Sequence, residues 1–114
     1  MTKRKIPTDI GEQALANPAS DLATAVRYCL QLIEQQVPGH SVELRIPPYG
    51  AIQCIEGLNH RRGTPPNVVE MAPEIFISLC LGETNWQVQM ESGKILASGG
   101  KTAELENLFP LRRD

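Results

Sequence analysis

The chain has 114 residues, a formal net charge of −2 and only 4% aromatic residues. It is long enough for one domain that buries a core without disulfide or metal staples. The small net charge and the few aromatic side chains argue against a nucleic-acid partner and against attraction to an anionic membrane.

The three cysteines indicate a reducing compartment. The number of cysteines is odd, and no two of them form a Cys-x-x-Cys pair. Each of them, Cys29, Cys54 and Cys80, lies in an apolar run, so we expect buried free thiols. The basic residues 1–5 are followed by no apolar signal segment, and no apolar run reaches the roughly 20 residues of a spanning helix. We therefore expect a cytoplasmic protein with no membrane span.

The first residues differ in character from the rest of the chain. Residues 1–19 are rich in turn formers and are expected to form an N-terminal arm, with a single helical turn at 11–16. Residues 20–114 are expected to form one domain.

The first confident element is a helix over residues 21–37. Ser20 or Asp21 caps it, and Pro38-Gly39 ends it. Its apolar side consists of Leu22, Val26, Cys29, Ile33 and Val37. Its opposite, polar side consists of Thr24, Arg27, Gln31, Glu34 and Gln35. This pattern predicts a helix with one side on the core and the other in solvent.

Three strands are expected next. Segments 42–46 and 51–56 alternate apolar and polar residues and flank the corner Pro47-Pro48-Tyr49-Gly50. The prolines fix the backbone and glycine tolerates a positive φ, so the chain reverses at this corner. A third strand at 67–71 follows a polar loop.

A helix over residues 74–81 is predicted mainly from its end signals. Pro73 suits a first helical position, and Gly82 suits the position just after a helix. The segment is apolar on almost every side, so we expect it to be deeply buried.

The last elements are a short helix, a strand and a final helix. Thr84 and Gln87 form a capping box for a helix at 85–91, a strand follows at 94–98, and Thr102 caps the last helix. The whole order predicts an α+β fold with a four- to five-stranded mixed or antiparallel sheet covered by helices.

Three motifs carry a family resemblance: Ile-Pro-Pro-Tyr-Gly-Ala at 46–51, Cys-Ile-Glu-Gly at 54–57 and Arg-Gly-Thr-Pro-Pro-Asn-Val-Val-Glu at 62–70. With them the chain resembles the bacterial sterol-carrier-like family, related to sterol carrier protein type 2, over about residues 21–111. The resemblance implies a helix-covered sheet around an apolar tunnel, and an apolar or lipid-like ligand. Met71-Ala72 departs from the family, which tends to place a polar cap there.

The apolar side chains of the later helices are the candidate ligand site. They are Phe76, Leu79, Trp86, Met90, Leu105 and Phe109. Apolar residues at helical spacing usually fill a core, so a filled core is the alternative. The resemblance favours a cavity, and the breaks at Gly82 and Gly99-Gly100 would let the covering helices move.

Arg61 and Arg62 are the candidate charged contacts. They follow His60 in the loop between the second and third strands, where two guanidiniums could hold an acidic head group. The alternative is a solvated loop whose arginines pair with Glu56 or Glu70.

No catalytic, metal or cofactor site is expected. Cys54 and His60 lack an orienting third group and an oxyanion site. Glu43 and Glu56 are better explained by ion pairs with nearby arginines than by acid–base chemistry. The histidines and cysteines fit no metal-ligand spacing.

Three functions follow from these expectations. The first is a non-enzymatic carrier for an apolar small molecule or lipid, and the second is a protein–protein interaction module with a filled core. The third is an accessory domain of an isomerase- or transferase-like enzyme, which the missing active-site constellation disfavours. The oligomeric state stays open.

Overall fold

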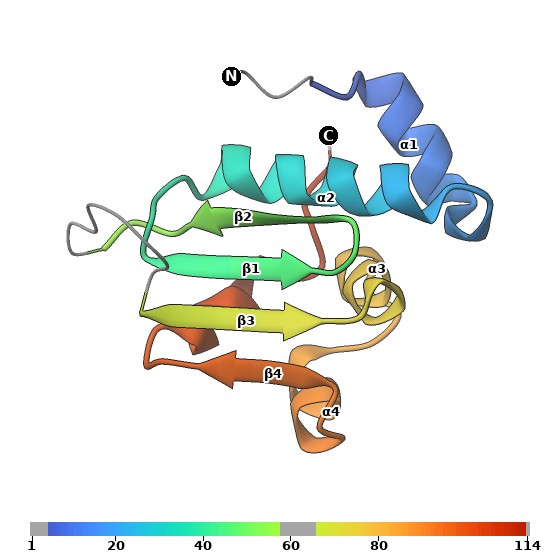
Figure 1. The fold of residues 1–114 in the computed structure, drawn as a ribbon. Helices are drawn as coiled ribbons and strands as arrows, with labels where there is room; N and C mark the ends of the chain where they lie inside the picture. Colours follow the sequence, from blue (N-terminus) through green and yellow to red (C-terminus); the bar gives the residue numbers. More distant parts are fainter. Residues whose placement is uncertain (1–4, 58–65, 114) are drawn as a thin grey trace.

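The computed structural model describes residues 5–57 and 66–113. Its elements in chain order are α1 (Thr8–Ala16), the 3-10 turn η1 (Pro18–Ser20), α2 (Leu22–Gln36), β1 (Val42–Ile46), β2 (Gly50–Cys54), β3 (Asn67–Met71), α3 (Pro73–Leu81), α4 (Trp86–Glu91), β4 (Ile95–Ser98) and the 3-10 helix η2 (Thr102–Leu108) (Figure 1). The expected order from α2 onward is confirmed. The single turn expected at 11–16 is instead a nine-residue helix, α1.

The strands form one four-stranded mixed sheet in the order β2-β1-β3-β4. β1 pairs antiparallel with β2 and parallel with β3, and β3 pairs antiparallel with β4. Leu44 of β1 lies opposite Ile52 of β2 and Val69 of β3, so three buried side chains align across the sheet. The expected α+β class is confirmed.

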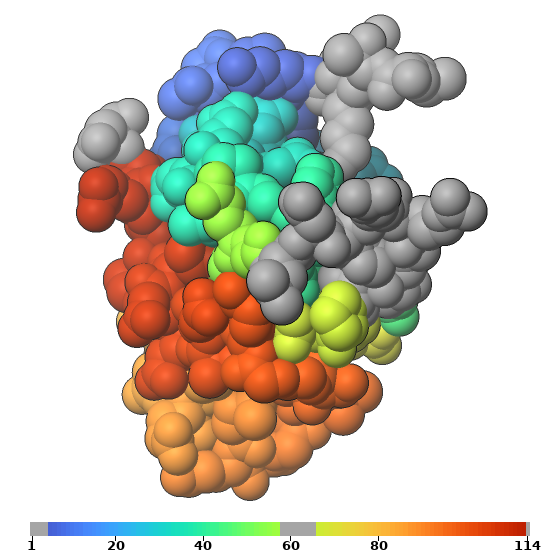
Figure 2. All heavy atoms as spheres, turned by 90° about the vertical axis from the view of Figure 1, so that its left-hand side faces the viewer, coloured from blue at the N-terminus to red at the C-terminus, as the bar shows by residue number. Residues whose placement is uncertain are grey.

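Strand alternation directs one face of the sheet into the core. Val42, Leu44 and Ile46 are fully buried, whereas Glu43 and Arg45 between them are partly exposed and form an ion pair. α2 packs against β2 and α3, and η2 packs against β3. Figure 1 shows η2 behind the strands, with α1 and α4 at opposite ends of the molecule. Figure 2, turned by 90°, shows the same separation, with α1 in blue at the top and α4 in orange at the bottom.

The helix α2 confirms its sequence pattern. Asp21 caps it, because the Asp21 Oδ1 accepts a hydrogen bond from the Thr24 N–H at 3.2 Å. On its apolar side Val26, Cys29 and Ile33 have no exposed surface. The helix therefore covers the buried face of the sheet at the β2 edge.

Two predicted caps were wrong. Asn85, not Thr84, caps α4, because the Asn85 Oδ1 accepts a hydrogen bond from the Val88 N–H at 2.9 Å. Thr102 does not cap the last helix, because it is the first residue of η2, and its hydroxyl donates to the Gly99 carbonyl at 2.9 Å.

The cysteine prediction is confirmed: Cys29, Cys54 and Cys80 are buried free thiols. In the described part of the chain, no helix has both the length and the apolar character needed to cross a membrane.

Candidate functional site

Five of the six expected apolar residues belong to the hydrophobic core or pack against it. Phe76, Leu79 and Leu105 have no exposed surface, and Trp86 is 5% exposed. The Phe109 ring stacks on Trp86 and meets Phe76 edge-on, with centroids 6.3 Å apart in both pairs. The aromatic rings therefore contact one another. Binding of a ligand between them stays a prediction.

The other expected contacts are not brought to this cluster. Met90 lies on α4 and is 38% exposed. Arg61 and Arg62, together with His60, lie outside the described residues. The proposed charged end of that site therefore remains a prediction from the sequence.

The catalytic alternatives find little support in the described residues. Burial, and to a smaller extent the negative charge of Glu34, raises the pKa of the Cys54 thiol to about 11. A neutral buried thiol is a poor nucleophile. Glu43 is paired with Arg45. Within residues 5–57 and 66–113, no group of histidine, cysteine and acidic side chains is placed to hold a metal.

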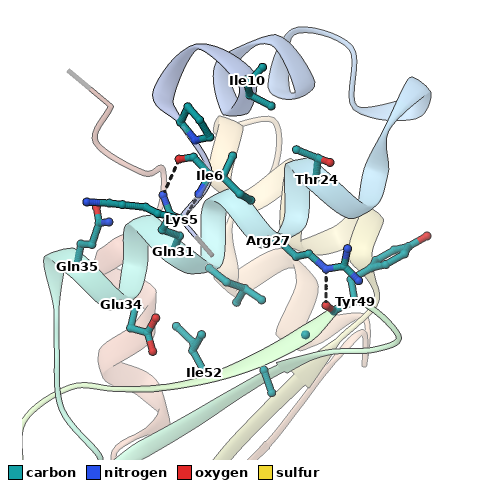
Figure 3. Close-up of a pocket in the computed structure, with 14 residues that line it drawn as sticks. Lys5, Ile6, Ile10, Thr24, Arg27, Gln31, Glu34, Gln35, Tyr49 and Ile52 are labelled. Carbon is teal, nitrogen blue, oxygen red and sulfur yellow. Dashed lines mark hydrogen bonds between the residues drawn. The ribbon is translucent and has the colours of Figure 1, made fainter. Parts of the chain in front are cut away.

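A groove of about 740 Å³ runs along the outward side of α2, and we call it the α2 groove (Figure 3). Residues 5–7 and Ile10 form one wall, and Tyr49 with the start of β2 forms the opposite one. α2 contributes Leu30 and the five polar residues expected to face solvent, which are Thr24, Arg27, Gln31, Glu34 and Gln35. The polar side of α2 is therefore part of a concave surface.

Four aliphatic side chains contribute to the lining of the α2 groove. Leu30 and Ile52 are 3% and 5% exposed, Ile6 is partly buried, and Ile10 is 46% exposed. Gly50 lets β2 come close to the helix, because a Cβ at this position would lie 3.2 Å from Leu30 Cδ1. Leu30 and Ile52 therefore form an apolar strip between α2 and the edge of the sheet, and Ile6 and Ile10 lie on the other side of α2 (Figure 3).

Arg27 joins α2 to the predicted corner between β1 and β2. Its Nε donates to the Tyr49 carbonyl at 3.0 Å, and its guanidinium lies 6.0 Å from the centroid of the Tyr49 ring. Figure 3 shows this pair at one end of the groove and Glu34 toward the other. Charged side chains therefore lie toward both ends of the groove, with Arg27 at one end and both Glu34 and Lys5 toward the other.

Gln31 holds the N-terminal segment across α2. The Ile6 N–H donates to Gln31 Oε1 at 2.8 Å, and Gln31 Nε2 donates to the Ile6 carbonyl at 3.0 Å, as the dashed lines in Figure 3 mark. One side-chain amide thus binds both backbone groups of one residue. This pair fixes the wall of the groove formed by residues 5–7.

A second, more polar pocket of about 560 Å³ lies between α2 and the C-terminal residues, and its lining includes Tyr28, Gln36, Arg112 and Arg113. Beside it, Glu12 of α1 accepts from Arg113 Nη1 at 2.6 Å and from the Tyr28 hydroxyl at 3.0 Å. Burial, followed by the hydrogen bond with Glu12, raises the pKa of the Tyr28 hydroxyl above its ordinary value of 10.0. The contact ties α1 to the end of the chain.

Sequence reasoning missed the α2 groove. Its polar side chains have the spacing of an ordinary solvent-facing helix surface. The available signal was in the arm, where Ile6, Ile10 and Ala14 recur every four residues and mark an apolar stripe that needs a partner.

Comparison with known proteins places the chain in a family. Among curated proteins, none matches the chain. Among solved structures, the chain is similar to the apo form of sterol carrier protein 2 from Yarrowia lipolytica, with 14% identity and a TM-score of 0.38 over 87% of this chain and 88% of that one. The family model described as bacterial SCP ortholog (SCP, sterol carrier protein) matches residues 18–111. Because this match runs from η1 to beyond η2, the chain belongs to the bacterial SCP ortholog family.

Proposed function

We propose that the protein is a non-enzymatic carrier that binds an apolar or lipid-like small molecule in the α2 groove. The observation that carries this proposal is a groove of about 740 Å³ beside the buried side chains of Leu30 and Ile52. Its volume falls within the roughly 300–1,000 Å³ of small-molecule sites. Membership of the bacterial SCP ortholog family supports ligand binding as the general role.

The lining suits an elongated ligand with a polar end. Leu30, Ile52 and Ile6 offer apolar contact along the groove, while Arg27 and Glu34 place charges toward its two ends. Apolar contacts supply most of the affinity of such sites, and a few polar groups fix the orientation of the ligand.

The aromatic cluster of Phe76, Trp86 and Phe109 is the competing position for the same ligand. A ligand there would have to displace the Phe109 ring from Trp86 and Phe76. Aromatic contacts of this kind contribute about 0.5–1.5 kcal/mol each beyond burial. Binding in the α2 groove breaks no such contact, because the structure already holds a cavity of about 740 Å³ there.

Two further parts of the proposal rest on the cysteines. The buried, neutral thiol of Cys54 supports a protein without covalent catalysis. The free thiols of Cys29, Cys54 and Cys80 support a cytoplasmic location, where thiols stay reduced.

One observation favours a second function, docking of a partner protein. Leu96 on the edge strand β4 is 65% exposed. Exposed edge strands can pair with a strand of another chain. This interaction module is the function that remains if the protein binds no small ligand.

The experiment measures thermal unfolding with a panel of a long-chain fatty acid, an acyl-CoA and a sterol. A bound ligand at 100 times its dissociation constant should raise the free energy of unfolding by about 2.7 kcal/mol. Two matched variants then locate the site, because Ile10 and Met90 are both exposed helix residues, at 46% and 38%, and lie on α1 and α4.

Ile10→Asp should weaken binding about tenfold, because it replaces an apolar side chain of the lining with a carboxylate that a bound apolar ligand would desolvate. Met90→Asp should leave binding unchanged. The reverse result would move the ligand to the later helices. A panel with no effect on the melting temperature would contradict the carrier and favour the interaction module.

A further inference from the structure

We propose that α1, together with residues 5–7, is a hinged lid whose opening controls entry to the α2 groove. The inference rests on the proposed function, because it concerns the same groove. It adds that α1 and residues 5–7 set the access of a ligand to the α2 groove, and that this segment opens while the sheet stays folded.

The position of the segment is the first ground. Ile6 and Pro7 line the groove from the arm, and Ile10 lines it from α1. Figure 3 shows Ile6 and Ile10 above α2, on the side away from Ile52 and the sheet. Movement of α1 away from α2 would therefore remove one whole wall and leave the buried side chains of the sheet in place.

Few polar contacts hold the lid segment to the rest of the protein. At the near end, the Gln31 amide binds both backbone groups of Ile6, at 2.8 and 3.0 Å. In the middle of α1, Glu12 binds Tyr28 and Arg113. Hydrogen bonds and partly exposed ion pairs of this type contribute modestly to stability, so they can break without global unfolding.

The apolar anchor of α1 is small. Its buried residues are Gly11, Ala14 and Leu15, and Gly11 rests directly on the Tyr28 ring. A helix with so little buried apolar surface belongs to the low end of local unfolding free energies. By contrast, α2 buries six residues, including Val26 and Ile33.

The connection to α2 has the form of a hinge. Asn17 and Asp21 have non-helical backbones, with φ and ψ of −147° and 75°, and of −154° and 70°. Between them lies only the three-residue turn η1. The family match begins at residue 18, within this turn, so the lid precedes the matched residues.

The first test needs no ligand and measures amide hydrogen exchange by mass spectrometry. In the wild-type protein, α1 should exchange faster than β1 and β3. Gln31→Leu removes both bonds to Ile6 and should speed exchange in α1 roughly tenfold, with no change in the strands. Gln87→Leu is the matched control, because Gln87 lies on α4, outside the α2 groove, and its amide donates to Glu91 of the same helix at 2.8 Å.

The second test measures dissociation of a fluorescent long-chain fatty acid by stopped flow. Gln31→Leu should speed dissociation by a factor similar to its effect on α1 exchange, and Gln87→Leu should leave dissociation unchanged. Exchange in α1 that stays unchanged in Gln31→Leu would overturn the lid. So would faster exchange in α1 with unchanged dissociation of the bound probe.

Failure of the proposed function gives a different result. If the wild-type protein binds no member of the panel, the carrier role is refuted. Exchange in Gln31→Leu still decides, without any ligand, whether α1 opens as a unit.

Discussion

Ile55 has an unusual backbone for a β-branched residue. It is the one non-glycine residue of the described chain with a positive φ, at 66°. The surroundings hold it there: its N–H donates to the Val37 carbonyl at 2.8 Å, and its carbonyl accepts from the Ser41 hydroxyl at 2.6 Å. Gly39 lies against it so closely that a Cβ on Gly39 would be 2.2 Å from the Ile55 carbonyl. Tertiary contacts therefore impose a conformation that isoleucine disfavours.

Glycine and alanine variants of Ile55 should reverse their usual order of stability. The left-handed backbone costs an L-residue roughly 1–2 kcal/mol, which glycine avoids. We expect Ile55→Gly to be as stable as Ile55→Ala or about 1 kcal/mol more stable. At Ile52, in a regular strand, alanine should be better by about 0.5–1 kcal/mol. Urea unfolding measures both pairs, and the same order at both positions would contradict strain at Ile55.

The buried thiols predict loss of stability in alkali. Burial raises the pKa of Cys54 from an ordinary 9.0 to about 11, so the folded state keeps its proton where the unfolded chain loses it. The stabilisation is complete below pH 9.0 and is lost as pH rises toward 11. Cys80 acts in the same direction, because burial and a hydrogen bond with Cys29 raise its pKa.

The free energy of unfolding should fall by up to about 1.4 kcal/mol per pH unit for each such thiol in this range. Cys54→Ala should flatten the decline measured by urea unfolding between pH 9 and 11. An equally steep decline in this variant would show that the Cys54 thiol does not contribute.

At the scale of elements, the contact between α1 and α2 depends on a glycine inside a helix. A Cβ at Gly11 would lie 2.2 Å from the ring of Tyr28. Helix propensity alone favours alanine at such a position by about 1 kcal/mol. Here the overlap of an alanine Cβ with the Tyr28 ring outweighs helix propensity. The ring cannot move aside easily, because it is buried and its hydroxyl donates to Glu12.

Gly11→Ala should therefore destabilise the protein by about 1–3 kcal/mol and speed exchange in α1. Gly100→Ala is the control, because a Cβ there meets nothing within 4 Å. Thermal unfolding compares the two. A Gly11→Ala protein as stable as the wild type would mean that α1 does not pack on Tyr28 as described.

The elements also show where local patterns suffice. The spacing of apolar residues alone predicts that Val26 and Ile33 are buried, and that Leu44 faces the core. The periodicity of a helix or strand decides which of its sides meets the core. The cap of α4 did not follow, because Thr84 and Asn85 both offer a side-chain acceptor in a suitable register. Which of the two residues caps α4 depends on the path of the chain after α3, and the local sequence pattern does not predict this path.

At the scale of the whole molecule, the class of fold was predictable and the candidate site was not. The parallel pairing of β1 with β3 joins segments that are far apart in sequence, so local spacing left it open. The same holds for the α2 groove, which exists because α1 returns over α2. Core and cavity share one apolar pattern, so the sequence could not show that the rings of Trp86 and Phe109 stack.

The most direct test of the central claim follows backbone amide signals of isotope-labelled protein during titration with a long-chain fatty acid. If the ligand binds in the α2 groove, saturable shifts should concentrate at Ile10, Leu30 and Ile52, which line it. The signals of Trp86 and Leu105 in the core should stay in place. Saturable shifts confined to Trp86 and Leu105, with Ile10 and Leu30 unmoved, would contradict binding in the α2 groove.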